Sequence, residues 1–380
     1  RPVGGDDTRG WGPPFLERED GSATAESAYF LSANRGKRSI TVDISTPEGQ
    51  GILREMVKTV DVFVENYKLG DMRRYGLDYA ALCEINPGLV YCSITGFGQT
   101  GPYSSRAGYD FVIQAMGGLM SITGQSDDQP GGGAQKCGVP ISDLMTGMYA
   151  SVAIVSALFE RTRSGKGQYI DMSLLDTQVA MLANLGATYL VGGRYEGKVP
   201  GRMGNAHQNV VPYQVFEVAP AQAGVRDYMI LAVGNDSQFA KFCELAGLAD
   251  LAADPRFTKN QDRVRNRGVL IPQLEAVMKT RPKAEWLSGL EKAKVPCGAI
   301  NNLAEVFADP HVQSRGMVSE WEHPLGVAFN IVASPLKLSA TPVRQDLPPP
   351  LLGQHTDQVL QEVLGLNAEE LQRLRDQRVI

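Results

Sequence analysis

This chain contains few cysteines, and their spacing does not suggest disulfide or metal-binding pairs. Five cysteines are scattered over 380 residues, and none belongs to a CxxC pair. An odd number of cysteines without paired spacing argues against a disulfide framework and predicts reduced thiols. We therefore expect the protein in a reducing compartment, either the cytoplasm or, in a eukaryote, the mitochondrial matrix.

The sequence also has little that would bind a metal, a nucleic acid or a membrane. Its four histidines show no metal-ligand spacing, so we predict no metal site. A net charge of −5 argues against a nucleic-acid surface. No uninterrupted apolar run reaches the roughly 20 residues of a membrane span, so we expect no membrane partner.

Three common motifs of cofactor binding and hydrolysis are missing. The chain contains no GxxxxGK[ST] phosphate loop, no GxGxxG after a strand and no GxSxG elbow. We therefore predict no permanently bound cofactor. A glycine run at 131–133 could cradle a phosphate, but such a run is more often simply a flexible loop.

The residues that are present predict an α/β protein. The composition is 43% hydrophobic and 21% charged, and the length suits two or three domains. Strand patterns alternate with helical patterns in the first half of the chain, which indicates a parallel sheet. One helix is expected to begin at Pro47 with Ser45 or Thr46 as its N-cap. The predicted strands are 39–44, 61–67, 89–94 and 167–176, and further helices are predicted at 79–86, 111–124, 144–161 and 177–193.

The pattern changes at about residue 192, where glycine, proline and asparagine become frequent. A second series of strand and helix patterns follows, typical of an α/β or α+β domain. We predict a large domain over 1–185, a linker over 186–210, a small domain over 211–320, and a linker with a C-terminal return to the large domain over 321–380.

Asp143 stands just before a long apolar helix pattern. Apolar residues recur behind it at helical spacing, from Leu144 to Phe159. Asp and Ser are preferred N-caps, so Ser142 or Asp143 could simply cap this helix. Only one cap is needed, however, and an ionised carboxylate at a helix start could act as a nucleophile. The local pattern leaves both roles open, and a non-catalytic scaffold remains an alternative.

Several stretches, taken in order along the chain, resemble family III CoA-transferases, the formyl-CoA transferase and carnitine CoA-transferase group. The subgroup that transfers CoA between succinate and glutarate is the most similar. The stretches that carry the resemblance are "GDDTRGWGPPF", "SANRGKRSITVDISTPEG", "DVFVENY", "YCSITGFGQTGPYSSRAGYD", "SDLMTGMYA", "RSGKGQYIDMSLLD", "VPCGAINN" and "PPPLLGQHTDQVL".

The resemblance implies a fold and an assembly. It implies a large Rossmann-like, parallel-sheet domain plus a smaller α/β domain, joined by long linkers in an interlocked homodimer. The family opens with a strand–helix–strand unit that ends in an acid–Arg pair, and Arg1 stands where that Arg is expected. We therefore expect the sequence to begin inside a longer protein.

The resemblance also implies an activity and a set of site residues. It implies that Asp143 is the nucleophile and that coenzyme A or acyl-CoA is a substrate, exchanged between a short dicarboxyl-CoA such as succinyl-CoA and a carboxylic acid such as glutarate. The stretch Gly201–Asn205 is a candidate lid. The implied CoA contacts are Arg1, Val42, Ser45, Asn66, Tyr67, Lys68, Arg74 and Arg106.

Acyl-CoA racemases of the same family are the main enzymatic alternative. They are similar in fold but use a His–Asp pair at the positions of Tyr109 and Asp110. A tyrosine with an ordinary pKa of about 10 is a poor base for removing an α-proton at neutral pH. The replacement of that His by Tyr109 favours transfer over racemisation.

Overall fold

The computed structural model describes residues 4–193, 199–222 and 224–380. The described chain divides into two compact units. The first contains residues 4–109, 143–177 and 304–380, and the second contains residues 110–142 and 178–303. Residues 110–142 therefore belong to the second unit and residues 304–380 to the first.

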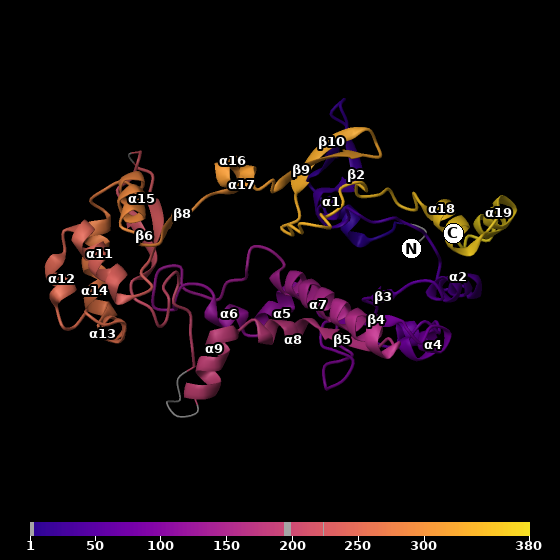
Figure 1. Cartoon of the computed structure of the whole chain (residues 1–380), viewed down its shortest axis with the longest axis horizontal. Coiled ribbons are helices and arrows are strands. Elements are labelled where there is room, and N and C mark those ends of the chain that lie inside the picture. The colour runs from indigo at the N-terminus through magenta and orange to yellow at the C-terminus, as the bar shows by residue number, and fades with distance from the viewer. Residues whose placement is uncertain (1–3, 194–198, 223) are drawn as a thin grey trace. The chain divides into compact units, whose positions relative to one another are not determined.

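A three-stranded parallel sheet organises the first unit (Figure 1). The strands β3 (Val62–Glu65), β4 (Val90–Thr95) and β5 (Tyr169–Ser173) lie in that order and are parallel. This confirms the predicted parallel sheet. Phe63, Tyr91 and Tyr169 occupy matching positions on the three strands. They therefore share one face, where the Phe63 and Tyr91 rings stack with centroids 5.1 Å apart.

The helices of the sheet region follow local signals in the sequence. Helix α2 (Pro47–Val57) begins with Pro47, and the Thr46 side chain accepts the Gly49 N–H, as predicted for a Thr46 cap. A buried cluster that includes Leu77, Leu82 and Leu89 packs beside the sheet. The other helices near the sheet are α3 (Asp71–Arg74), α4 (Tyr79–Ile85), α7 (Ile141–Ser164) and α8 (Leu174–Ala180), which continues into the second unit.

The predicted strand at 39–44 is wrong. This segment belongs to no strand, because its backbone pairs with the C-terminal region instead. Ser39 donates its N–H to His355 Nδ1 at 3.1 Å, and Asp43 donates its N–H to the Val379 carbonyl at 2.7 Å. The C-terminal helices α18 (Thr356–Leu364) and α19 (Ala368–Asp376) then pack Leu360 and Leu371 into a cluster with Ile52 of α2.

A buried ion pair organises the N-terminal region. Arg9 donates from Nη1 to both carboxylate oxygens of Glu26, at 2.8 and 2.7 Å, and from Nη2 to the Pro350 carbonyl at 2.9 Å. Its guanidinium also lies 3.8 Å from the centroid of the Phe30 ring. The elements of this region are η1 (Asp7–Gly10), β1 (Phe15–Glu17), β2 (Ala23–Ser27), α1 (Ala28–Ala33), β9 (Val318–His323) and β10 (Val327–Val332). Helices α16 (Leu303–Ala308) and α17 (Pro310–Ser314) precede β9 in the chain.

The strands β9 and β10 form an antiparallel hairpin where a linker was expected from residue 321. Every second residue of β9 points into the protein, so Ser319, Trp321 and His323 are all buried. The period of two that marks a strand was present in the sequence, but the intervening acidic residues gave it a polar composition.

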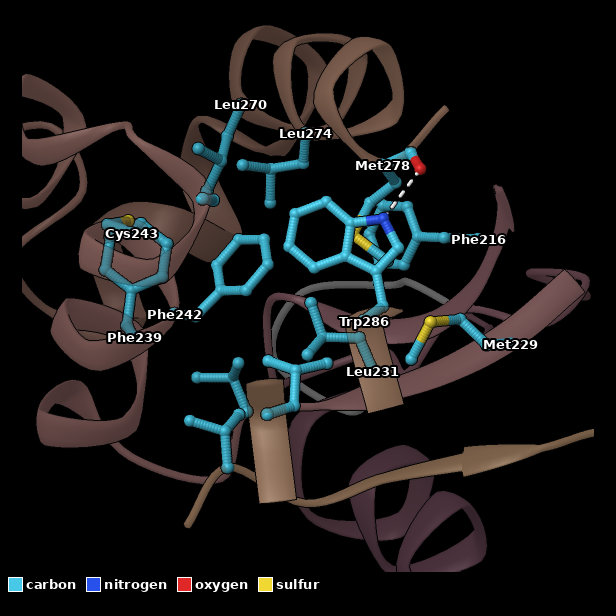
Figure 2. Close-up of a cluster of buried hydrophobic side chains, with 14 of the residues drawn as sticks. Phe216, Met229, Leu231, Phe239, Phe242, Cys243, Leu270, Leu274, Met278 and Trp286 are labelled. Carbon is cyan, nitrogen blue, oxygen red and sulfur yellow. Dashed lines mark hydrogen bonds between the residues drawn. The ribbon is translucent and has the colours of Figure 1, made fainter. Parts of the chain in front are cut away.

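The second unit contains an antiparallel sheet of β6 (Tyr213–Val218), β7 (Asp227–Ala232) and β8 (Cys297–Ala299). Helices cover it and bury a cluster centred on Trp286, whose indole N–H donates to the Met278 carbonyl at 2.9 Å (Figure 2). The arrangement is α+β, one of the two predicted alternatives. The covering helices are α11 (Asp236–Ala246), α12 (Ala249–Ala253), α13 (Asn260–Arg265), α14 (Arg267–Met278) and α15 (Lys283–Lys292).

The second unit also includes the segment that precedes α7. The helix expected over 111–124 is divided into α5 (Asp110–Met116) and α6 (Leu119–Ile122). The division falls at Gly117–Gly118, since Gly118 has a φ of 87° and a side chain at Gly117 would meet Gln178. The helix expected over 177–193 is likewise divided, into α8, α9 (Ala183–Thr188) and the π-helical turn η2 (Tyr189–Gly193).

Candidate active site

Asp143 lies in the first turn of α7 and is exposed. The helix begins at Ile141, two residues earlier, so the prediction that Ser142 or Asp143 is the N-cap is wrong. The cap comes from another element, because Pro140 offers no polar side chain. The Asp110 carboxylate accepts the Ser142 N–H at 2.8 Å through Oδ1. Asp143 is therefore not required as the N-cap of its own helix.

The stretch Gly201–Asn205, predicted as a lid, is hydrogen-bonded to the loop after α6. Gly204 donates its N–H to the Gly124 carbonyl at 2.9 Å, and Arg202 Nε donates to the Gln125 carbonyl at 3.0 Å. Arg202 also forms an ion pair with Asp127. A lid function of this stretch stays a prediction.

Helix α7 carries an apolar stripe that faces away from its buried side. Its members recur three or four residues apart, and each is more than half exposed, with Val155 at 65%. We call this set the α7 stripe: Leu144, Met148, Val152, Val155 and Phe159. By length and composition, α7 is also the one helix in the described part of the chain that could cross a membrane, which is weak evidence for a membrane span.

A cavity of about 490 Å³ lies beside the parallel sheet, lined by the loop after β3 and by Tyr91 and Tyr169 near the starts of β4 and β5. Tyr67 and Lys68, both predicted CoA contacts, line it directly after β3. The part of the cavity beside Tyr67 and Lys68 lies at the carboxyl end of β3, the edge at which parallel α/β sheets bind ligands. The remaining lining residues are Glu65, Leu69, Gly70, Met72, Arg73, Asp78, Tyr79, Ala80, Tyr91, Gln99 and Tyr169.

The aromatic wall of this cavity was not predicted from the sequence. The Tyr79 ring lies 6.0 Å from Tyr91 and 5.5 Å from Tyr169, measured between centroids. The matching positions of Tyr91 and Tyr169 on adjacent parallel strands bring them together. The sequence does show an aromatic residue near the start of each strand. Their contact could be predicted only with knowledge of how the strands are aligned in the sheet.

Glu65, which lines the cavity, has a carboxyl group whose pKa is shifted. Burial raises the pKa of Glu65, while hydrogen bonds from Ser93 and from the Tyr67 N–H act in the opposite direction. Gln99 donates from Nε2 to Ser93 Oγ at 2.9 Å, and its backbone N–H donates to the Asp171 carboxylate at 3.0 Å. Burial also raises the pKa of the Cys92 thiol to about 11, so it is not a reactive thiolate.

The other predicted CoA contacts are not lining residues of this cavity. Val42 packs against the cluster of α2, α18 and α19, and Ser45 donates its hydroxyl to Asp43 at 2.6 Å. Arg74 lies over the Tyr75 ring, and Arg106 lies over the Tyr103 ring at 4.6 Å. Asn66 is exposed between two lining residues, and Arg1 lies outside the described residues.

Metal binding finds no support in the described ranges of the chain. Among these residues, no group of three or more His, Cys, Asp or Glu side chains is placed to hold a metal ion. The start of α7 itself offers the exposed carboxylate of Asp143 at a helix N-terminus.

Comparison with known proteins defines the class of this α/β protein. The chain belongs to CoA-transferase family III, whose family model matches residues 1–356. It is 47% identical to the succinate–glutarate CoA-transferase of Agrobacterium fabrum, over 95% of this chain and 87% of that protein. It is 43% identical to the succinyl-CoA:glutarate CoA-transferase of Homo sapiens, over 96% of this chain and 78% of that protein. A crystal structure of a CAIB/BAIF family protein from Brucella suis is 47% identical, with a TM-score of 0.77 over 94% of this chain and 89% of that chain.

Proposed function

We propose that this protein transfers CoA from succinyl-CoA to glutarate, with Asp143 as the nucleophile. The observation that carries the proposal is membership of CoA-transferase family III together with 47% identity to a relative named for succinate and glutarate. The exposed position of Asp143 in the first turn of α7 supports its role, because a nucleophile must reach the substrate.

The first half of the reaction moves CoA onto the enzyme. The Asp143 carboxylate attacks the thioester carbonyl of succinyl-CoA. The carbon–sulfur bond breaks, which leaves a mixed anhydride and CoA thiolate. The thiolate then attacks the Asp143 carbonyl of the anhydride and expels succinate, so that CoA is held as a thioester of Asp143. The covalent route divides one difficult exchange into easier steps.

The second half of the reaction repeats these steps in reverse with the acceptor. The carboxylate of glutarate attacks the Asp143 thioester and releases CoA thiolate, forming a second anhydride. The thiolate attacks the glutaryl carbonyl, which gives glutaryl-CoA and regenerates the Asp143 carboxylate. No net proton is gained or lost. Backbone N–H groups at the start of α7 are suited to stabilise the oxyanions that form at the Asp143 carbonyl.

CoA binding is proposed at the cavity that follows β3. Aromatic rings at Tyr67, Tyr79 and Tyr169 offer a surface for a flat base, and Lys68 and Arg73 offer cations for phosphate groups. Arg1, Val42, Ser45, Asn66, Arg74 and Arg106 remain proposed contacts from the family resemblance. The parallel-sheet unit is accordingly the proposed Rossmann-like, CoA-binding domain. No permanent cofactor is proposed, because CoA is itself the substrate.

The α7 stripe supports a homodimer as the functional form. Its five apolar side chains lie on one face of a single helix and are more than half exposed. A contiguous apolar face of this kind marks an interaction surface. An interlocked homodimer is the expected assembly of the family, and a second copy of this chain is therefore the proposed cover of the stripe.

Racemisation remains the alternative activity. Tyr109 is 72% exposed and replaces the histidine of the racemases. A phenol is a poorer general base than an imidazole, so the replacement disfavours removal of an α-proton. A CoA-binding scaffold is the non-enzymatic alternative, and it would bind acyl-CoA without exchange.

Label transfer tests these three possibilities in one reaction. Succinyl-CoA and ¹³C-glutarate are incubated with the protein in D₂O and analysed by mass spectrometry. The proposal expects ¹³C-glutaryl-CoA and free succinate in equal amounts, with no deuterium gained at carbon. Deuterium uptake without label transfer would identify a racemase, and unchanged substrates would leave only the scaffold.

A further inference from the structure

We infer that Asp110, held by Gln114, is a positioning residue that orients the first turn of α7 and thereby the carboxylate of Asp143. The inference rests on the proposed role of Asp143 as nucleophile. Asp110 has no part in the bond-making steps. It acts through the backbone of the residue that directly precedes Asp143 in the same helical turn.

The helix start lacks a cap of its own. Pro140 precedes Ile141 and has neither a backbone N–H nor a polar side chain. The Ile141 N–H donates to the Val139 carbonyl at 2.8 Å. The next donor of the first turn, the Ser142 N–H, is accepted by Asp110 Oδ1 at 2.8 Å. A carboxylate here satisfies a donor and interacts favourably with the positive end of the helix dipole.

The orientation of Asp110 is set by a fully buried amide. Gln114 is 0% exposed, and its Oε1 accepts the Cys137 N–H at 2.8 Å. A backbone N–H can only donate, so the oxygen of Gln114 must face Cys137 and its NH₂ group must face Asp110. Gln114 Nε2 donates to Asp110 Oδ2 at 2.6 Å. Asp110 therefore meets a donor at each oxygen, which an ionised carboxylate satisfies and an amide does not.

A second contact restrains the same turn from α8. Ser142 is 0% exposed, and its hydroxyl donates to Gln178 Oε1 at 2.7 Å. Gln178 is also 0% exposed. Ser142 is thus held at its backbone by Asp110 and at its side chain by Gln178. Small displacements of a nucleophile reduce the rate strongly, so these contacts have a direct consequence for Asp143.

The donor and acceptor pattern suggests a pair of substitutions that break and then restore the contact. Asp110→Asn places an NH₂ group against either the Ser142 N–H or the NH₂ of Gln114. Adding Gln114→Glu restores the match, because the new carboxylate accepts both the new amide and the Cys137 N–H. The double substitution also keeps the total charge. Asp250→Asn, at an exposed position in the first turn of α12, removes the same charge elsewhere in the unit as a control.

The experiment measures two quantities on each full-length variant. Hydrogen–deuterium exchange of the peptide that contains residues 138–146 reports the order of the α7 start independently of activity. The rate at which succinyl-CoA, without acceptor, loads CoA onto Asp143 reports the chemistry. We expect Asp110→Asn to exchange faster in this peptide and to load CoA about 10- to 100-fold more slowly, with KM for succinyl-CoA changed less than twofold. The double variant should recover both quantities, and Asp250→Asn should match the wild type.

Three outcomes would overturn the inference. Loading at the wild-type rate by Asp110→Asn would show that Asp110 does not position Asp143. Slow loading that Gln114→Glu fails to restore, with normal exchange at 138–146, would assign Asp110 a different role. Absence of CoA loading in the wild type would overturn the proposed function itself, and the inference with it.

Discussion

The Glu65 carboxylate accepts the Tyr67 N–H through Oε2 at 2.7 Å, so the acid at the end of β3 shapes the loop that lines the cavity. Burial raises the pKa of this carboxyl above its ordinary value of 4.5. The folded protein therefore favours the protonated form. Its stability falls as the pH rises from the ordinary value through the raised one.

Glu65→Gln should consequently stabilise the protein at neutral pH. The amide can still accept the Tyr67 N–H, but it cannot ionise. Its melting temperature should exceed that of the wild type at pH 7, and the difference should shrink to zero as the pH falls below 4.5, where the wild-type carboxyl is neutral in both states. A difference that grows on acidification would contradict the burial of this group.

Lys68 should contribute to acyl-CoA binding without contributing to stability. It is exposed and lines the cavity, where it can pair with a phosphate group of CoA. Lys68→Ala should raise KM for succinyl-CoA about tenfold, the equivalent of one charge-assisted hydrogen bond, and leave KM for glutarate and the melting temperature unchanged. Lys58→Ala, an exposed lysine paired with Glu55 at the end of α2, is the control. Equal effects of the two substitutions would remove Lys68 from the binding site.

Arg263 should be essential to the second unit. It is 0% exposed and donates to the Val211 and Phe257 carbonyls and to Asp236, at 2.6, 2.9 and 2.9 Å. Arg263→Met removes the donor to the Val211 and Phe257 carbonyls and the buried charge that pairs with Asp236, and it should reduce the free energy of unfolding by about 3–5 kcal/mol. Arg265→Met, at an exposed position on the same helix α13, should reduce it by less than about 0.5 kcal/mol. Urea denaturation followed by fluorescence measures both values.

A charged residue within the α7 stripe should prevent dimer formation. Val152→Glu places a carboxylate in the middle of the stripe, where burial against a second copy would leave it unpaired. Sedimentation at micromolar concentration should show a dimer for the wild type and a loss of dimer for Val152→Glu. Ser164→Glu, at the last residue of α7 and outside the stripe, should remain a dimer. A monomeric, active wild type would contradict the proposed assembly.

Features set by neighbouring residues were predictable from the sequence. The strands at 62–65 and 90–95 and the Thr46 cap of α2 follow from side-chain periodicity and from capping residues within a few positions. The segment 39–44 has the composition of a strand, but its hydrogen-bond partners lie more than 300 residues away. No local pattern distinguishes such an extended segment from a strand.

The features of the candidate site also differ in whether they could be predicted from neighbouring residues. Asp143 could be singled out because its acid stands beside an apolar helix pattern and within a family motif. The contact of Asp110 with Ser142 spans 32 residues, and the aromatic wall depends on the register of β4 and β5. These relationships arise only when separate elements pack, so the sequence alone could not supply them.

The most direct test of the central claim is the mass of the protein after incubation with succinyl-CoA in the absence of acceptor. The wild type should carry one CoA as a thioester, and hydroxylamine should convert Asp143 in the corresponding peptide to a hydroxamate. Asp143→Asn should carry none and lose several orders of magnitude in turnover, while its melting temperature changes little because Asp110 still caps α7. An adduct on another residue, or near-normal turnover by Asp143→Asn, would contradict the assignment of Asp143 as the nucleophile.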